Sequence, residues 1–140
     1  MTDKEIIIKS FVDNFVLKDK RERCYAELTN PKKRNKFTDR LNHKWDTILN
    51  MKYLVQIDKT KDNTLDIQKL LNFKDNDICY AISNYGDYDG KLLPFKEVFN
   101  EVYSRGFGTI LINKTADTLF LDTEQERGGT DRFIGKRKLV

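Results

Sequence analysis

Thr109-Ile-Leu-Ile-Asn-Lys-Thr-Ala-Asp-Thr-Leu-Phe-Leu-Asp122 is the segment from which a β-sheet in this protein can be predicted. It contains two short apolar runs, 109–113 and 118–122, rich in residues that favour β-strands. Only the short link 114–117 separates them. The stretch therefore predicts two strands that belong to a meander.

The segments on either side of this pair predict further strands and one helix. An amphipathic helix opens at Pro94 and closes at Arg105-Gly106, with Gly106 as its C-cap. Before it lies the apolar run 78–82, which predicts a strand. After the pair, Gly128-Gly129 turns the chain into a last strand around 132–134. The helix is long enough to let the strands near 78–83 and 107–113 run parallel.

The first half of the chain is mainly helical in pattern. Thr2 or Asp3 can cap a first helix, and Asp19 followed by Glu22 resembles a capping box for a second. A third helix is expected to run from Asn30-Pro31 to about Leu49. Its expected buried residues are Phe37, Leu41, Trp45 and Ile48. A short strand at 53–57 and a short helix capped by Thr64 follow.

Helices first and strands later predict an α+β fold. We expect N-terminal helices packed on a small, mostly antiparallel sheet of three to five strands, with a β-α-β-β-β C-terminal segment. The 140 residues fit a single domain, 1–140, with a helical region 1–50 and a sheet-containing region 51–140.

Composition limits the cellular setting and the chemistry. Cys24 and Cys79 each sit among apolar neighbours, so both are expected to be small buried hydrophobes. No signal peptide pattern and no run of about 20 apolar residues is present, which predicts a cytoplasmic protein without a membrane partner. With one His and two Cys, no zinc site and no cofactor are expected.

A basic segment is the first candidate binding surface. Residues 17–44 contain ten Lys or Arg against four Asp or Glu, whereas the whole chain has a net charge of +4. On a helix over 31–49, the four-residue spacing would place four of these ten cations in one row that could bind phosphates, with a fifth beside it. The row and its neighbour are Lys32, Lys33, Lys36, Arg40 and Lys44. A solvated outer helix face explains the same pattern without a ligand.

A loop with aromatic and acidic residues is the second candidate. Its composition suits a contact with another protein, and the residues are Tyr85, Asp87, Tyr88 and Asp89. Its spacing fails as a calcium loop, because Tyr85 and Lys96 would occupy positions that require acids. The alternative is a turn whose Gly and Asp residues adopt unusual backbone angles.

A set of carboxylates is the third candidate. Acids at 122–131 could bind a divalent metal or act as acid and base, and they are Asp122, Glu124, Glu126 and Asp131. Arg127 and Arg132 can instead pair with them. His43 has no catalytic partners near it in the sequence, and no phosphate-binding glycine motif is present.

Three functional hypotheses follow, in order of preference. The first is a non-enzymatic binding or regulatory protein that contacts another macromolecule, with protein the expected partner. The second is nucleic-acid binding through the basic helix 31–49. The third is a metal-dependent enzyme that uses the carboxylates near 122–124, although no motif in the sequence supports catalysis.

Overall fold

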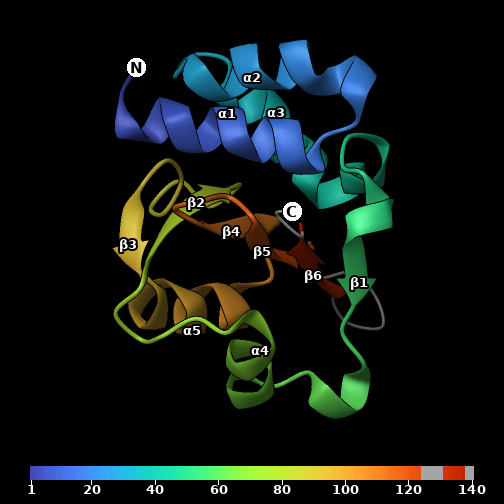
Figure 1. The fold of residues 1–140 in the computed structure, drawn as a ribbon, viewed down its shortest axis with the longest axis vertical. Helices are drawn as coiled ribbons and strands as arrows, with labels where there is room; N and C mark the ends of the chain where they lie inside the picture. Colours follow the sequence, from blue (N-terminus) through green and yellow to red (C-terminus); the bar gives the residue numbers. More distant parts are fainter. Residues whose placement is uncertain (124–130, 138–140) are drawn as a thin grey trace.

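The computed structural model describes residues 1–123 and 131–137. Within these ranges the chain forms five α-helices and six strands (Figure 1). The helices are α1 (Asp3–Phe15), α2 (Arg21–Thr29), α3 (Arg34–His43), α4 (Thr64–Leu71) and α5 (Phe95–Arg105). The strands are β1 (Leu54–Gln56), β2 (Ile78–Ser83), β3 (Leu92–Pro94), β4 (Thr109–Asn113), β5 (Thr118–Asp122) and β6 (Arg132–Lys136). The fold is therefore α+β, as predicted.

The strands form one sheet in the order β1-β6-β5-β4-β2-β3, and every neighbouring pair is antiparallel. The parallel alternative for β2 and β4 is therefore wrong. The sheet has six strands instead of three to five, and its C-terminal segment is β-β-α-β-β-β. The added strand is β3, a three-residue edge strand that ends in Pro94 and pairs only with β2. Its proline and short length hide the usual strand pattern.

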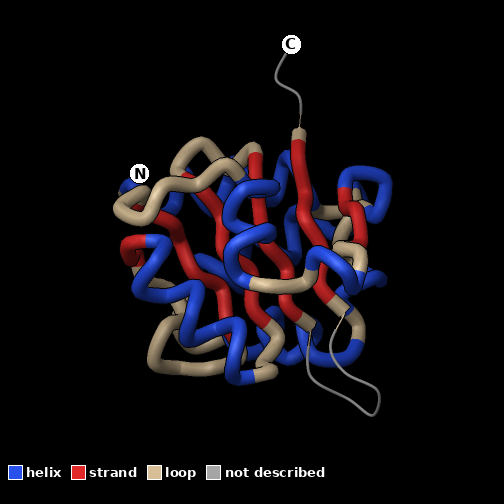
Figure 2. Tube along the Cα trace, turned by 90° about the horizontal axis from the view of Figure 1, so that it is seen from below, coloured by secondary structure: helices blue, strands red, loops and turns tan. Residues whose placement is uncertain are grey.

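Helices cover both faces of the sheet. Helices α1 to α3 pack on one face, and α4 and α5 pack on the other (Figure 1). Figure 2 views the sheet from the side of α4 and α5, with the strands side by side. Along β2, Tyr80 and Ile82 pack into the core between the sheet and α1 to α3. Cys79 and Ala81 pack into the core between the sheet and α4 and α5. Burial on both faces explains why the central strands are continuous apolar runs.

Helix ends agree with the sequence pattern at some positions only. The Thr2 hydroxyl accepts the Glu5 N–H, and the Glu5 side chain bonds back to Thr2, as a capping box requires. No such box opens α2, because a 3₁₀ turn at 18–20 precedes it and no side chain caps it. Helix α4 is capped by Asn63 instead of Thr64. The predicted C-cap Gly106 is confirmed, with φ 73°.

The third helix is shorter than the expected range 31–49. The Asn30 side chain accepts the N–H of Lys32, which favours a turn before α3 begins at Arg34. The helix ends at His43, because Lys44 leaves helical geometry with φ −135° and ψ 28°. A 3₁₀ turn then carries the Trp45 ring to 4.8 Å from the Phe133 ring, centroid to centroid. Packing against β6 therefore overrides the helical pattern.

Both cysteines are buried and free, in agreement with the predicted burial. Burial raises the pKa of the Cys24 thiol to about 11 and that of the Cys79 thiol to about 12. Both thiols therefore stay protonated near neutral pH and act as small apolar side chains.

Among the described residues, no helix has the length and apolar character needed to cross a bilayer.

Candidate functional site: an aromatic patch anchored to the sheet

Three aromatic side chains from two connections meet at one end of the sheet. Tyr85 and Tyr88 lie between β2 and β3, and Phe107 lies between α5 and β4. The ring centroids of Tyr85 and Phe107 are 5.2 Å apart with the planes tilted by 24°, and those of Tyr85 and Tyr88 are 5.1 Å apart. Phe107 is 37% exposed. We call Tyr85, Tyr88 and Phe107 the aromatic patch.

Charged groups hold the rings of the aromatic patch in place. The Tyr85 hydroxyl donates to Asp87 at 2.9 Å, and the Tyr88 hydroxyl donates to Glu101 at 3.1 Å. The guanidinium carbon of Arg105 lies 5.2 Å from the Tyr85 ring centroid, and its Nη2 donates to Glu101 at 3.2 Å. The hydrogen bond to Asp87 raises the pKa of Tyr85 above its ordinary value. Both tyrosine hydroxyls therefore remain neutral donors at physiological pH.

A partly buried ion pair anchors the connection that carries the two tyrosines. Arg34 Nε and Nη2 donate to the two carboxylate oxygens of Asp89 at 2.6 and 2.9 Å. The side chains of Arg34 and Asp89 are only 12% and 18% exposed. Asp89 also accepts the N–H of Ser83 at 2.9 Å, and Arg34 Nη1 donates to the Leu28 carbonyl. A bidentate pair of this kind fixes both position and orientation.

The predicted contact residues therefore divide into two groups. Tyr85, Asp87 and Tyr88 reach the surface beside one another, whereas both carboxylate oxygens of Asp89 are bound within the chain. We therefore assign Asp89 an anchoring role and leave it out of the contact surface.

Helix α3 is hydrogen-bonded to both connections that carry the aromatic patch. Asn84 Nδ2 donates to Asp39 on α3 at 2.9 Å. The Gly108 N–H donates to Asn42 Oδ1, also at 2.9 Å, which ties the α5–β4 connection to the same helix. The Asn84 N–H donates to the Gly108 carbonyl, so the two connections also bond to each other. These bonds tie both connections that carry the patch to α3 and to each other.

The sequence pattern did not indicate Phe107 or Arg105 as members of this surface. Both follow the main body of the amphipathic helix, and only the fold brings them next to a loop some twenty positions earlier in the chain. One signal could have indicated Phe107: it stands between Gly106 and Gly108, outside the apolar stripe of the helix and outside the next strand. An aromatic residue with no place in either pattern is a candidate for surface exposure.

The basic candidates are arranged differently from the expected helical row. Lys32, Lys33, Lys36 and Lys44 are exposed, but of the five basic candidates only Lys36 and Arg40 lie within α3. Both Nη atoms of Arg40 donate to the carboxylate of Glu27, which is 5% exposed. Lys36 is therefore the one helical member of the row whose charge faces solvent. Nucleic-acid binding through these residues stays an untested prediction.

The carboxylate candidates do not gather into a metal site within the described residues. Asp122 is fully buried, Asp131 is exposed, and Glu124 and Glu126 lie outside the ranges that the structure describes. Among the described residues, no three His, Cys, Asp or Glu side chains are grouped to hold a metal ion. The enzyme hypothesis stays untested.

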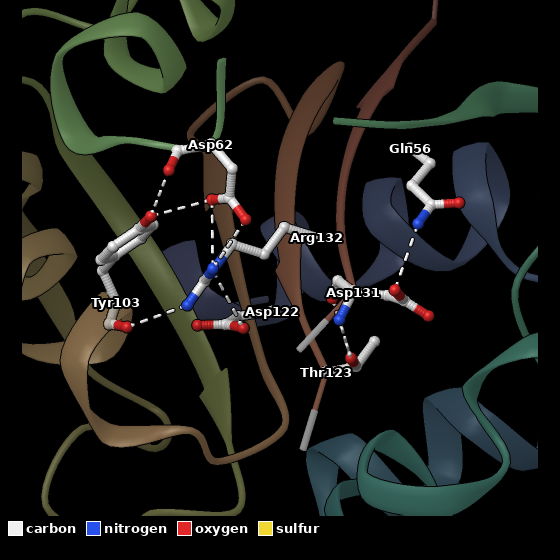
Figure 3. Close-up of polar contacts among 7 residues, drawn as sticks. All are labelled: Gln56, Asp62, Tyr103, Asp122, Thr123, Asp131 and Arg132. Atoms are coloured by element: carbon white, nitrogen blue, oxygen red, sulfur yellow. Dashed lines mark hydrogen bonds and ion pairs between the residues drawn. The ribbon is translucent and has the colours of Figure 1, made fainter. Parts of the chain in front are cut away.

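A row of polar side chains crosses four strands beneath α5. Ser83, Thr109, Asp122 and Arg132 are direct cross-strand neighbours, so their side chains share one face of the sheet. The Ser83 and Thr109 hydroxyl oxygens are 2.7 Å apart, and Ser83 also accepts the Tyr85 N–H. The row thus begins under the aromatic patch and ends at Arg132, whose contacts are drawn in Figure 3.

The chain matches no family model, no curated protein and no solved structure. The aromatic patch is partly exposed to solvent, whereas Ser83, Thr109 and Asp122 of the polar row are buried.

Proposed function

We propose that this is a non-enzymatic binding or regulatory protein, and that it contacts another protein through the aromatic patch. The observation that carries the proposal is the contact of the Tyr85 ring with the rings of Tyr88 and Phe107 at the surface, on a β2–β3 connection anchored by the Arg34–Asp89 pair. Exposed aromatic side chains with no structural need for exposure are typical of interaction sites.

The composition of the surface favours a protein partner. Tyr and Arg are the residue types that most often dominate the energy of protein interfaces, and the patch combines two tyrosines with Arg105. Its hydroxyl and carboxylate groups form the polar rim that such interfaces have. Because the rings are already ordered by hydrogen bonds within the chain, binding loses little side-chain entropy.

The charges beside the patch disfavour a nucleic-acid ligand at this surface. Asp87 and Glu101 are both exposed and accept hydrogen bonds from the patch tyrosines. Two carboxylates beside the rings would repel the phosphates of a stacked strand, whereas affinity for nucleic acids depends largely on phosphate neutralisation. A protein partner can instead offer a cationic or hydrogen-bonding group to these acids.

Changing Tyr85 and Tyr88 together to Ala is expected to weaken partner binding at least about thirtyfold, as the loss of interface anchors worth about 2 kcal/mol requires. The full chain is used to capture a stoichiometric protein partner from an extract of its source cells. Titration calorimetry with that partner then compares the dissociation constants of the two forms.

The matched control changes Lys32 and Lys36 to Ala, two exposed cations that lie outside the aromatic patch. This variant is expected to bind the partner as the unmodified chain does. Equal affinity in the tyrosine variant would contradict the proposal. The proposal would also be contradicted if the capture returned only nucleic acid and the lysine variant no longer bound it. That result would support nucleic-acid binding through the basic residues instead.

A further inference from the structure

Asp122 is a buried carboxyl group whose hydrogen-bonding capacity is unused among the described residues. It lies at the end of β5 with 0% exposure, and neither carboxylate oxygen accepts a hydrogen bond from them. The nearest cation in the described part of the chain is Arg132 Nε, 3.4 Å away on β6, and that nitrogen likewise has no hydrogen-bond partner there. Buried polar atoms are normally satisfied, so this arrangement calls for an explanation.

The remainder of the Arg132 side chain is fully engaged elsewhere (Figure 3). Nη1 donates to both carboxylate oxygens of Asp62 at 3.1 and 2.9 Å, and Nη2 donates to the Tyr103 carbonyl at 3.1 Å. The guanidinium carbon lies 3.9 Å from the centroid of the Tyr103 ring. The Tyr103 hydroxyl in turn donates to the Asp62 carbonyl and carboxylate. Arg132 therefore joins β6 to α5 and to the segment before α4.

Two acids thus compete for one arginine. Among residues 1–123 and 131–137, the charged and titratable groups that face Asp122 are Arg132 from β6, Asp62 from the segment before α4, and Tyr103 from α5. Thr109, its cross-strand neighbour on β4, is neutral. Arg132 already compensates the charge of Asp62, so an ionised Asp122 would leave one buried negative charge without a counterion. Such a charge is costly in a protein interior.

We propose that Asp122 and Arg132 form a proton-controlled latch. With Asp122 neutral, Arg132 holds Asp62 and Tyr103 and keeps the segment before α4 and the end of α5 against β6. With Asp122 ionised, its carboxylate draws Arg132 toward β5 and loosens the contacts with Asp62. Burial of Asp122 raises its pKa to about 7, with Arg132 opposing the shift and Asp62 adding to it.

The latch is tested by nuclear magnetic resonance on the full chain between pH 5 and 9. The Asp122 carboxyl carbon is expected to titrate with a midpoint near 7, and the Arg132 Nε–H signal and the amides of 61–63 should move with the same midpoint. A carboxyl midpoint below 5 would overturn the proposal. The proposal would also be overturned if Asp122 titrated with a midpoint near 7 while the Arg132 and 61–63 signals stayed unchanged.

A variant separates this transition from other titrations. Asp122→Asn should abolish the shared transition, whereas Asp131→Asn, which neutralises an exposed acid immediately before β6, should retain it. The pKa of Asp122 is higher in the folded chain than in the unfolded chain. The stability that the neutral carboxyl group contributes is therefore complete below about pH 4 and is lost as the pH rises toward 7. Relative to Asp122→Asn, the unfolding constant should rise about tenfold per pH unit in that window.

A transition that persists in Asp122→Asn would assign the titration to another group and refute the latch. If Asp122→Asn does not fold, the carbon titration of the unmodified chain still decides the question. The test does not involve the aromatic patch, so its outcome and the outcome of the partner experiment are independent.

Discussion

Replacing Arg34 with Met is expected to lower the free energy of unfolding by about 3–5 kcal/mol, because the change leaves the Asp89 carboxylate largely buried without its counterion. The change also removes the donor to the Leu28 carbonyl. Asp89 would keep only the Ser83 N–H among the hydrogen bonds described above. Urea denaturation followed through the fluorescence of Trp45, the single tryptophan, measures the loss.

Arg105→Met is the matched control. Arg105 also contacts the β2–β3 connection, through the Tyr85 ring, but its side chain is 46% exposed. Loss of such an exposed pair is expected to cost far less stability than loss of the Arg34–Asp89 pair, because solvent screens it. Adding Asp89→Asn to Arg34→Met should recover some of the loss, since a neutral amide is easier to bury than a carboxylate. Equal effects of Arg34→Met and Arg105→Met would contradict the anchoring role of Arg34.

Gly108→Ala is the second change with a large expected effect. A Cβ atom at this position would lie 2.6 Å from Asn42 Oδ1 and 2.7 and 2.8 Å from the backbone carbonyl of Leu41. The backbone of α3 cannot yield as a side chain can, so overpacking should lower the free energy of unfolding by at least about 1–3 kcal/mol. The same change pushes Phe107 away from Tyr85, and partner affinity should fall with it.

Gly86→Ala controls for the loss of a glycine near the patch. No atom lies within 4 Å of a Cβ built there, so the free energy of unfolding should change by less than about 1 kcal/mol. Urea denaturation of both variants under the same conditions provides the comparison. A Gly108→Ala protein as stable as Gly86→Ala would show that α3 and the α5–β4 connection are not in the close contact described above.

The sequence predicted the central strands well for a physical reason. The runs 109–113 and 118–122 are buried on both faces, so their apolar character is continuous and their ends are marked by polar residues. Strand β3 has neither property, because it is three residues long and all three are only partly buried. Its pairing is set by β2, which no local pattern around Leu92–Pro94 reveals.

The candidate site was only partly predictable. Tyr85 and Tyr88 stand out in a polar loop, so composition alone indicated them. The roles of Asp89 and Phe107 depend on partners 55 and 22 positions away, Arg34 and Tyr85, and sequence spacing does not show such contacts. The same limit applies to Arg40, whose pairing with Glu27 removes it from the expected row of exposed cations.

Site-specific photo-crosslinking distinguishes the aromatic patch from another exposed surface as the place where a partner binds. A benzophenone amino acid replaces Phe107 in one protein and Val55 in another; Val55 is 70% exposed on the edge strand β1. The aromatic patch as a protein-binding surface predicts one stoichiometric crosslinked partner from position 107 and none from position 55. A partner that crosslinks from position 55 and not from position 107 would contradict it.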